Sequence, residues 1–245
     1  MENITLLIAS IRIIMKSSMD IWGKCKLSDF GYWASGGGFP REYQGHIGLK
    51  YLFCKVGDMN RPGNEIYIQS TENTIDDEIA GIINVKIHPP GTVIFPKIGG
   101  AIATNKRRIL TKDSAIDNNC LGIIPNNDTD SEWLYYLLNS IDFSNYQSGT
   151  SVPALRQSVI GDIEVPSLPK YLQQQIVEFL RWLKGKSALD SWDTSPALPL
   201  ELEKQKSLIT RLERVNVLKD LHDQIGKQIE ELVSSIVNET TIGYS

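Results

Sequence analysis

The chain has 245 residues, of which 41% are hydrophobic and 22% are charged. A chain of this length and composition can bury one core, or form one domain with an appended helical arm. Its formal net charge is −4, which excludes a nucleic-acid binder that relies on overall positive charge, so any cationic surface must be local or completed by a partner.

The amino-terminal stretch from Met1 to Met15 is apolar, but it is too short to span a bilayer and Arg12 interrupts it. It lacks the basic leader and the small-residue cleavage site of a signal peptide. Two interpretations are open: an amphipathic leading helix, or additional residues upstream of a true start at Met15 or Met19.

The region from Trp22 to Ile82 predicts short strands separated by turns. Between Thr71 and Ile82 a short helix is expected, with Thr74 or Asp76 as its cap. The strand-like runs are 27–33, 47–55 and 66–68.

The triple glycine Gly36–Gly38 predicts a loop whose backbone can approach another surface closely. Arg41 and Tyr43 follow it, so this rim is either a contact surface or an ordinary turn with solvated charges. It is not a phosphate-binding loop, because no helix-opening pattern follows the glycines.

From Ile79 to Lys112 the sequence contains no Asp or Glu but several Lys and Arg residues. Within this segment, residues 93–110 predict a pair of strands around Gly99-Gly100, with a cationic cluster at 105–108. Cations on strand ends and loops without neighbouring acids are what a surface that binds the nucleic-acid backbone needs. The alternative is an exposed strand whose Lys and Arg side chains are merely solvated.

A further apolar strand is predicted at 118–124 and a short helix at 132–140, preceded by a capping signal. The helix aromatics Trp133, Tyr135 and Tyr136 are expected in the core. A strand-like run at 160–165 then ends at Pro166 and Pro169, which separate a strand-rich first part from a helical second part.

The helical part begins with a predicted helix at 172–186. From Leu202 to Val237 there is no proline, and apolar residues recur at spacings of three and four. This pattern is typical of a coiled-coil seam, which over this length reaches on the order of 50 Å. One such stripe cannot bury itself, so we expect it to pack on a second helix from this chain or from a partner.

Catalytic signatures are missing from the sequence. The cysteines Cys25, Cys54 and Cys120 lie far apart, which predicts reduced cytoplasmic thiols and neither a disulfide framework nor a zinc site. No Walker A loop, nucleophile elbow or His-Glu-x-x-His motif occurs. We therefore expect a chain that is not an enzyme and that binds no metal or cofactor itself.

Several blocks in order resemble one known family. They are Gly36–Pro40, Val56–Asn60, Val93–Arg107, Asn118-Asn119, Gly149–Ser151, and two Leu-Pro…Gln helix openings at Leu168-Pro169 and Leu198-Pro199. Each block is weak alone, but together they resemble the specificity (S) subunits of type I restriction-modification systems over nearly the whole chain. The Glu that usually precedes Gln in the helix opening is Leu172 in the first copy and Lys204 in the second, which puts in doubt any contact credited to that Glu.

The resemblance implies an α+β protein in which a β-rich target-recognition domain precedes a long helical, coiled-coil-like arm. Residues 20–166 would be the target-recognition domain, and 167–245 the region for spacing, dimerisation and methyltransferase docking. Residues 1–19 would then be a leader or a mis-assigned start, because the family's domain normally begins near Asp20. Family members typically hold two recognition domains, so this chain resembles a half-subunit.

The implied function is sequence-specific binding of double-stranded DNA, reading one half of a bipartite target. Partner methyltransferase (M) subunits would bind S-adenosylmethionine and methylate adenine, and restriction (R) subunits would cleave. The chain would form a homodimer or pair with a second half-subunit, in the cytoplasm and away from membranes. The competing hypothesis is a coiled-coil adaptor that binds protein and has no affinity for DNA.

The residues expected to contact DNA lie on the glycine loop, in the acid-free segment and near the domain junction. Arg and Asn side chains can make bidentate base contacts, whereas Lys, Ser and Thr more often hold phosphates. They are Arg41, Tyr43, Lys97, Asn105, Lys106, Arg107, Arg108, Ser148, Thr150, Ser151 and Arg156.

Overall fold

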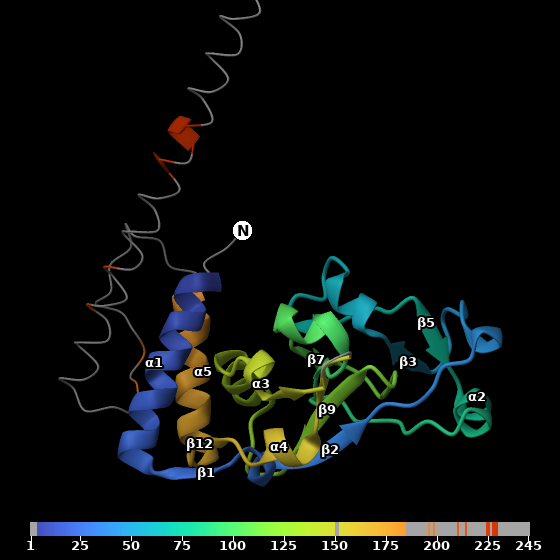
Figure 1. Cartoon of the computed structure of the whole chain (residues 1–245), viewed down its shortest axis with the longest axis horizontal. Coiled ribbons are helices and arrows are strands. Elements are labelled where there is room, and N and C mark those ends of the chain that lie inside the picture. Colours follow the sequence, from blue (N-terminus) through green and yellow to red (C-terminus); the bar gives the residue numbers. More distant parts are fainter. Residues whose placement is uncertain are drawn as a thin grey trace, which may run out of the picture.

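The computed structural model describes residues 4–149 and 152–184, with side chains from residue 11 onward, and isolated positions between 196 and 229. Two long helices stand side by side at one end, and a body of short strands and turns extends away from them (Figure 1). The mixed α+β organisation agrees with the prediction. Almost all of the coiled-coil segment predicted for 202–237 lies outside the described residues.

A central sheet of five strands forms the body, in the order β2-β9-β6-β7-β4. Neighbouring strands are antiparallel except β4 and β7, which are parallel. Side chains alternate between two cores: Val93 and Phe95 face the helices, whereas Ile94 faces the opposite side. Because both faces are covered, these strands are short apolar runs. The bounds are β2 (Gly31–Ser35), β4 (Tyr67–Ile68), β6 (Val93–Pro96), β7 (Arg108–Leu110) and β9 (Cys120–Pro125).

The predicted strand pair around Gly99-Gly100 is confirmed, since Val93 lies opposite Ile109 in the antiparallel pair of β6 and β7. The connection between the two strands contains a short 3-10 helix, η4 (Gly99–Thr104). The run at 27–33, predicted as one strand, is instead the 3-10 turn η1 (Leu27–Phe30) followed by β2.

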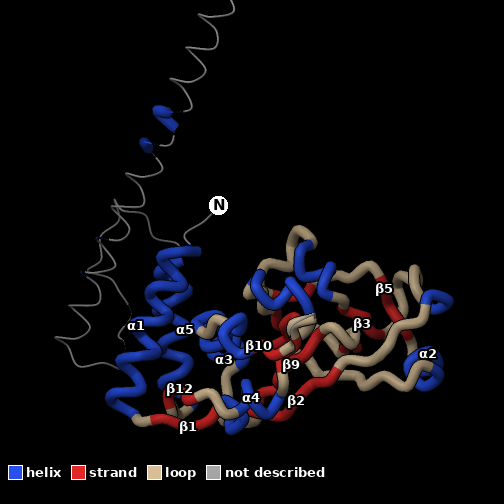
Figure 2. The backbone as a smooth tube through the Cα atoms, in the orientation of Figure 1, coloured by secondary structure: helices blue, strands red, loops and turns tan. Residues whose placement is uncertain are grey.

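A second, three-stranded sheet forms a lobe at the end of the body opposite the long helices (Figure 2). Its order is β5-β3-β8, with β3 parallel to β8. Phe39 stacks on Phe53 with ring centroids 3.7 Å apart, which anchors the loop after the glycines to this lobe. The predicted helix in this region is confirmed, and Asp76 is the cap that accepts from the Ile79 amide. The elements are β3 (Tyr51–Cys54), β5 (Asn73–Ile75), β8 (Ser114–Ile116) and α2 (Asp77–Ile82).

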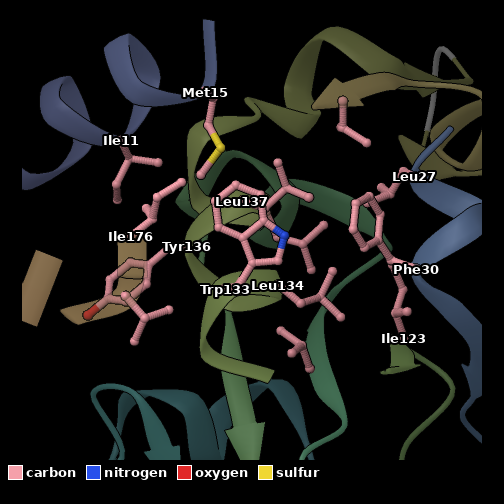
Figure 3. Packing of buried hydrophobic residues seen from close by; sticks show 14 of the residues in the cluster. Ile11, Met15, Leu27, Phe30, Ile123, Trp133, Leu134, Tyr136, Leu137 and Ile176 are labelled. Carbon is pink, nitrogen blue, oxygen red and sulfur yellow. The ribbon is translucent and has the colours of Figure 1, made fainter. Parts of the chain in front are cut away.

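Three helices and the central sheet enclose the main core (Figure 3). They are α1 (Ile4–Trp22), α3 (Ser131–Ser140) and α5 (Lys170–Lys184). As predicted, Trp133 and Tyr136 are buried, and the side chain of Asp130 caps α3 by accepting from the Trp133 amide.

Helix α1 contributes Ile11, Ile14 and Met15 to this core. The first of the two interpretations of the amino-terminal stretch therefore describes its structure. These residues pack against α3 and α5. The other interpretation, additional residues upstream of a true start at Met15 or Met19, concerns the start of translation and stays a prediction.

The body begins and ends at one place. Strand β1 (Lys24–Lys26), which follows α1, pairs antiparallel with β12 (Glu164–Pro166), which precedes α5, and Cys25 lies opposite Val165. The strand predicted at 160–165 is wrong over its first part, because α4 (Gln157–Gly161) occupies it, but the strand does end at Pro166. Within the described part of the chain, no helix combines the length and apolar character needed to cross a bilayer.

Candidate nucleic-acid interface

Four separate segments lie next to one another beyond the ends of the central strands. Gly37 bridges to Asp117, the Lys97 amide donates to the Asn119 carbonyl over 2.8 Å, and the Gly99 amide donates to the Pro153 carbonyl over 2.8 Å. We call these segments the loop row. They are residues 36–38, 117–119, 97–100 and 153–156.

Glycine is required where the first two segments meet. A Cβ atom on Gly36 would lie 1.7 Å from the backbone oxygen of Asp117, which no side chain can tolerate. The Asp117 carboxylate then caps its own turn, accepting from the Asn119 amide and from the Asn119 side chain, each over 3.1 Å. The glycine loop is therefore fixed to the turn before β9.

The loop row contains several of the expected contact residues. Arg156 is exposed at the start of α4, and Lys97 is half-buried with a free amine among the described residues. Ser148 belongs to the hairpin of β10 (Gln147–Ser148) and β11 (Ala154–Leu155), which is joined to Lys97 by the Leu155 amide over 2.9 Å. Thr150 and Ser151 lie outside the described residues.

Two exposed asparagines in the row, Asn118 and Asn119, were not among the expected contacts. Asparagine has both donors and acceptors that can read base edges. The signal in the sequence was the Asn118-Asn119 block of the family resemblance, but only the strand order places it between the glycine loop and Lys97.

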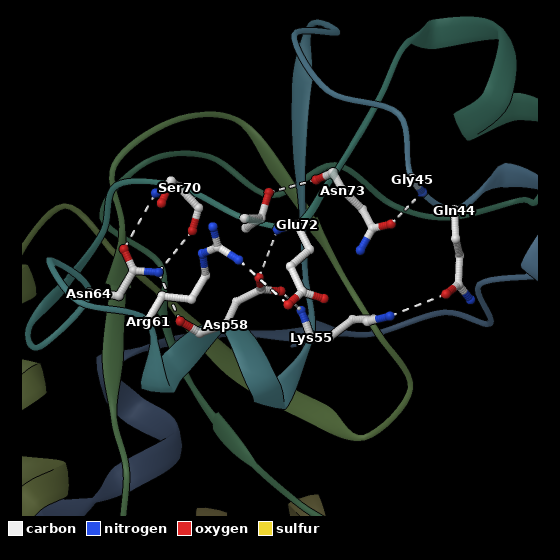
Figure 4. Close-up of polar contacts among 10 residues, drawn as sticks. Gln44, Gly45, Lys55, Asp58, Arg61, Asn64, Ser70, Glu72 and Asn73 are labelled. Carbon is white, nitrogen blue, oxygen red and sulfur yellow. Dashed lines mark hydrogen bonds and ion pairs between the residues drawn. The ribbon is translucent and has the colours of Figure 1, made fainter.

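Arg41 and Tyr43 lie on the lobe and not in the loop row. They form the 3-10 turn η2 (Arg41–Tyr43), in which Arg41 is exposed and Tyr43 half-buried. The Gln44 side chain donates to the Phe39 carbonyl over 2.8 Å. The Gly45 amide donates to the Asn73 side chain over 2.8 Å, which ties this turn to the three-stranded sheet (Figure 4).

A buried polar network shapes the neighbouring turn, η3 (Val56–Asn60). The carboxylate of Asp58, only 2% exposed, accepts from the Lys55 amide over 2.8 Å and from the Glu72 amide over 2.9 Å (Figure 4). Asn64, also buried, donates to the Asp58 and Ser70 carbonyls. The Val56–Asn60 block of the resemblance therefore has a structural role, because it satisfies the backbone of this turn.

One member of the cationic cluster at 105–108 is fully internal, and the other three residues are partly exposed. Arg107 is 1% exposed, and its guanidinium lies 4.1 Å from the Phe143 ring centroid and 5.5 Å from that of Phe95. Burial lowers the pKa of Arg107 to about 9, so the side chain stays charged at neutral pH. The expectation that Arg107 contacts DNA is wrong, because no part of its guanidinium is open to a ligand.

The two neighbours of Arg107 hold the η3 turn. Lys106 donates to the Asn60 side chain, and Arg108 donates to the carbonyls of Met59 and Arg107. Burial also lowers the pKa of Arg108. The charged groups of Lys106 and Arg108 therefore form hydrogen bonds within the protein, and a run of cations in the sequence does not reveal such bonds.

A polar contact joins α5 to the body. Arg181 donates to both carboxylate oxygens of Glu132 on α3, over 2.8 and 2.6 Å, and Tyr67 on β4 donates to the same carboxylate. Partial burial by itself raises the pKa of Glu132, but the bonds from Arg181 and Tyr67 outweigh it and the pKa is lowered. The contact lines a cleft of about 370 Å³. Among the described residues no group of His, Cys, Asp or Glu is arranged to hold a metal ion.

Comparison with known proteins decides the family. The family model for the type I restriction modification DNA specificity domain matches residues 19–191, well over half of the chain. The chain belongs to this family. No curated protein matches this specificity-domain chain.

Two solved structures share the fold. The first is a structure described as the basis of complex assembly and conformational transition of the type I R-M system. It matches with a TM-score of 0.51 and 13% identity, over 81% of this chain and 42% of the other. The HsdS subunit from Thermoanaerobacter tengcongensis matches with a TM-score of 0.50 and 13% identity, over 84% of this chain and 46% of the other. The specificity-domain chain thus spans less than half the length of either structure.

Proposed function

We propose that this chain is the DNA-recognition part of a type I restriction-modification complex and reads one half of a bipartite target. Membership of the specificity-domain family supports this function. The observation that carries it is the loop row, in which separate segments bring polar and cationic side chains to one edge of a rigid sheet. Loops held by a rigid scaffold are the usual place for such recognition.

The chemistry belongs to other subunits in this proposal. Methyltransferase subunits would bind S-adenosylmethionine and methylate adenine, and restriction subunits would cleave DNA. The chain itself contributes recognition and spacing in the cytoplasm. In this proposal the chain pairs with a second recognition half, identical or different, because a bipartite target has two half-sites to be read.

Within the loop row, Lys97 and Arg156 are the cations that face a ligand. Each phosphate contact adds about 0.9 to the slope of log affinity against log salt concentration. The double variant Lys97→Ala plus Arg156→Ala should therefore flatten this slope by about 2 units. Lys16→Ala, on the exposed side of α1, is the control and should leave the slope unchanged. An unchanged slope in the double variant would remove the loop row from the interface.

Methylation mapping tests the function as a whole. The chain is expressed with the methyltransferase encoded beside it in a methylation-free host, and modified adenines are sequenced. A split palindrome means two identical copies, each reading one half-site, and an asymmetric split motif means a different second half. No methylation, with both proteins folded and associated, would contradict the proposal and favour the protein-binding adaptor.

A further inference from the structure

Arg107 is a buried cation that no carboxylate contacts directly within the part of the chain that the structure describes, although the charge of Asp142 favours its charged form. Among the described residues no carboxylate forms an ion pair with it. Removing a guanidinium from water without a partner charge is costly, so other contacts must offset the loss of hydration. The faces of Phe95 and Phe143 supply part of this, and hydrogen bonds to three acceptors supply more.

Two of the three hydrogen bonds hold the end of the loop that follows η4, and the other joins this loop to the end of α3. Nη1 of Arg107 donates to the Lys106 carbonyl over 2.9 Å, and Nη2 donates to the Ile141 carbonyl over 3.3 Å. The third, at 2.7 Å, joins Nη2 of Arg107 to Oδ1 of Asn105. Asn105 ends η4 in a left-handed backbone conformation, with φ of 50°, and its amide donates to the Ile102 carbonyl.

This arrangement fixes which way the Asn105 side chain faces. A guanidinium has only donors, so the oxygen of the carboxamide must point at Arg107 and the NH2 group must point away. Among the described residues this NH2 group donates to no acceptor, although Asn105 is partly exposed. A free asparagine can rotate and present either group, whereas Asn105 is held with its donors outward.

We propose that Arg107 is a positioning residue that presents the Asn105 NH2 group as a fixed donor to an acceptor on a base edge. This rests on the proposed function. In the major groove guanine presents the acceptors O6 and N7, thymine presents O4, and adenine presents N7 beside its N6 donor, whereas cytosine presents only a donor. Asn105 is therefore the specificity-determining residue for one base pair, at which it reads the acceptor of guanine or thymine and rejects cytosine. Holding the donor in place before binding removes the ordering cost that a freely rotating side chain incurs.

Asn105→Asp tests the direction of the donor at constant size. One carboxylate oxygen takes the place of Oδ1 and pairs with Arg107, and the other replaces the outward donor with an acceptor. We expect the melting temperature to equal or exceed that of the wild type, because the buried cation gains a counter-ion. In the methylation map, one base pair should change from guanine or thymine to cytosine or adenine, which present donors.

Asn84→Asp is the matched control. Asn84 also has a left-handed backbone, with φ of 51°, and is exposed after α2, but it has no bond to an arginine. The same substitution at this position should leave the methylated motif unchanged.

Arg107→Met tests the positioning role directly, because it keeps an unbranched side chain against Phe95 and Phe143 but removes every donor. Discrimination at the same base pair should fall about tenfold, and the other positions of the motif should keep theirs. The salt slope of binding should not change, because Arg107 touches no phosphate. A role in stability alone would weaken all positions equally and would be accompanied by a lower melting temperature.

The outcomes separate the two proposals. If the wild type yields no motif, the proposed function fails, and this inference fails with it. If the wild type yields a motif that Asn105→Asp leaves unchanged while the protein is folded, the inference alone is overturned. That result decides the question even if Arg107→Met does not fold.

Discussion

Arg181→Ala should loosen the attachment of α5 to the β-sheet body. The substitution removes two charge-assisted hydrogen bonds to Glu132, whose side chain is only 16% exposed, whereas that of Arg181 is 59% exposed. Fully exposed ion pairs contribute about 0.2–1 kcal/mol and hydrogen bonds to charged groups about 1.5–3 kcal/mol. Because solvent screens the exposed Arg181 side chain, the contribution of this contact should lie between these two ranges. The free energy of unfolding should therefore fall by about 1–2 kcal/mol. For a chain of this size that lowers the melting temperature by about 2–8 °C.

The assay is a double-mutant cycle in urea with Arg181→Ala, Glu132→Gln and the combination. At pH 7 the coupling free energy should be about 1 kcal/mol. The pKa of Glu132 is lowered in the folded protein, so its stabilisation is present above the ordinary value of 4.5 and is lost as pH falls through the folded value. The coupling should therefore shrink below pH 4.5.

The matched control is Lys50→Ala, which breaks an ion pair with Asp77 in which both side chains are mostly exposed. No measurable change in the urea midpoint is expected there. A coupling between Arg181 and Glu132 near zero at pH 7, or one that does not depend on pH, would refute the argument that this contact holds α5 in place.

Gly36→Ala should abolish cooperative melting in circular dichroism, because the new Cβ would lie 1.7 Å from a backbone oxygen. Gly38→Ala is the control, because its Cβ would meet nothing within 4 Å, and it should melt like the wild type. Similar melting curves for the two variants would contradict the close approach at Gly36. Burial raises the pKa of the Cys54 and Cys120 thiols, so both should react with a thiol reagent far more slowly in the native protein than in urea, and rapid native labelling would show that they are accessible. Asp58→Ala leaves two backbone N–H groups without their acceptor and should lower the free energy of unfolding by about 2–4 kcal/mol in urea titrations; a loss under about 0.5 kcal/mol would mean that the network does not form.

Local patterns predicted those elements that depend on neighbouring residues. The caps of α2 and α3 are side chains next to the helices they start, and the apolar strands at β6 and β9 are short runs with covered faces. The helix α1 was harder to predict, because its apolar stripe packs on α3 and α5, which follow more than a hundred residues later. A stripe without a visible partner resembles a leader.

The site shows the same division. The cluster at 105–108 looked like a DNA-binding patch because sequence displays charge but not surroundings. Phe95 and Phe143 come from different elements, and only the fold brings both rings against Arg107. Conversely, the loop row joins blocks that were each visible in the sequence, but their adjacency depends on the strand order, with β9 between β2 and β6.

The pairing of β1 with β12 has a consequence for how such proteins change over generations. The two ends of the body meet in this two-stranded pair, so both leave α1 and α5 at the same point, while α3 of the body also packs on these two helices. A segment whose ends meet can be replaced by another of different size without moving the elements on either side. A gene segment exchanged between the codons for β1 and β12 would therefore replace the body while α1 and α5 keep their packing on each other, provided that the new segment carries a helix that matches α3. Under the proposed function, a new target could then arise in one recombination event.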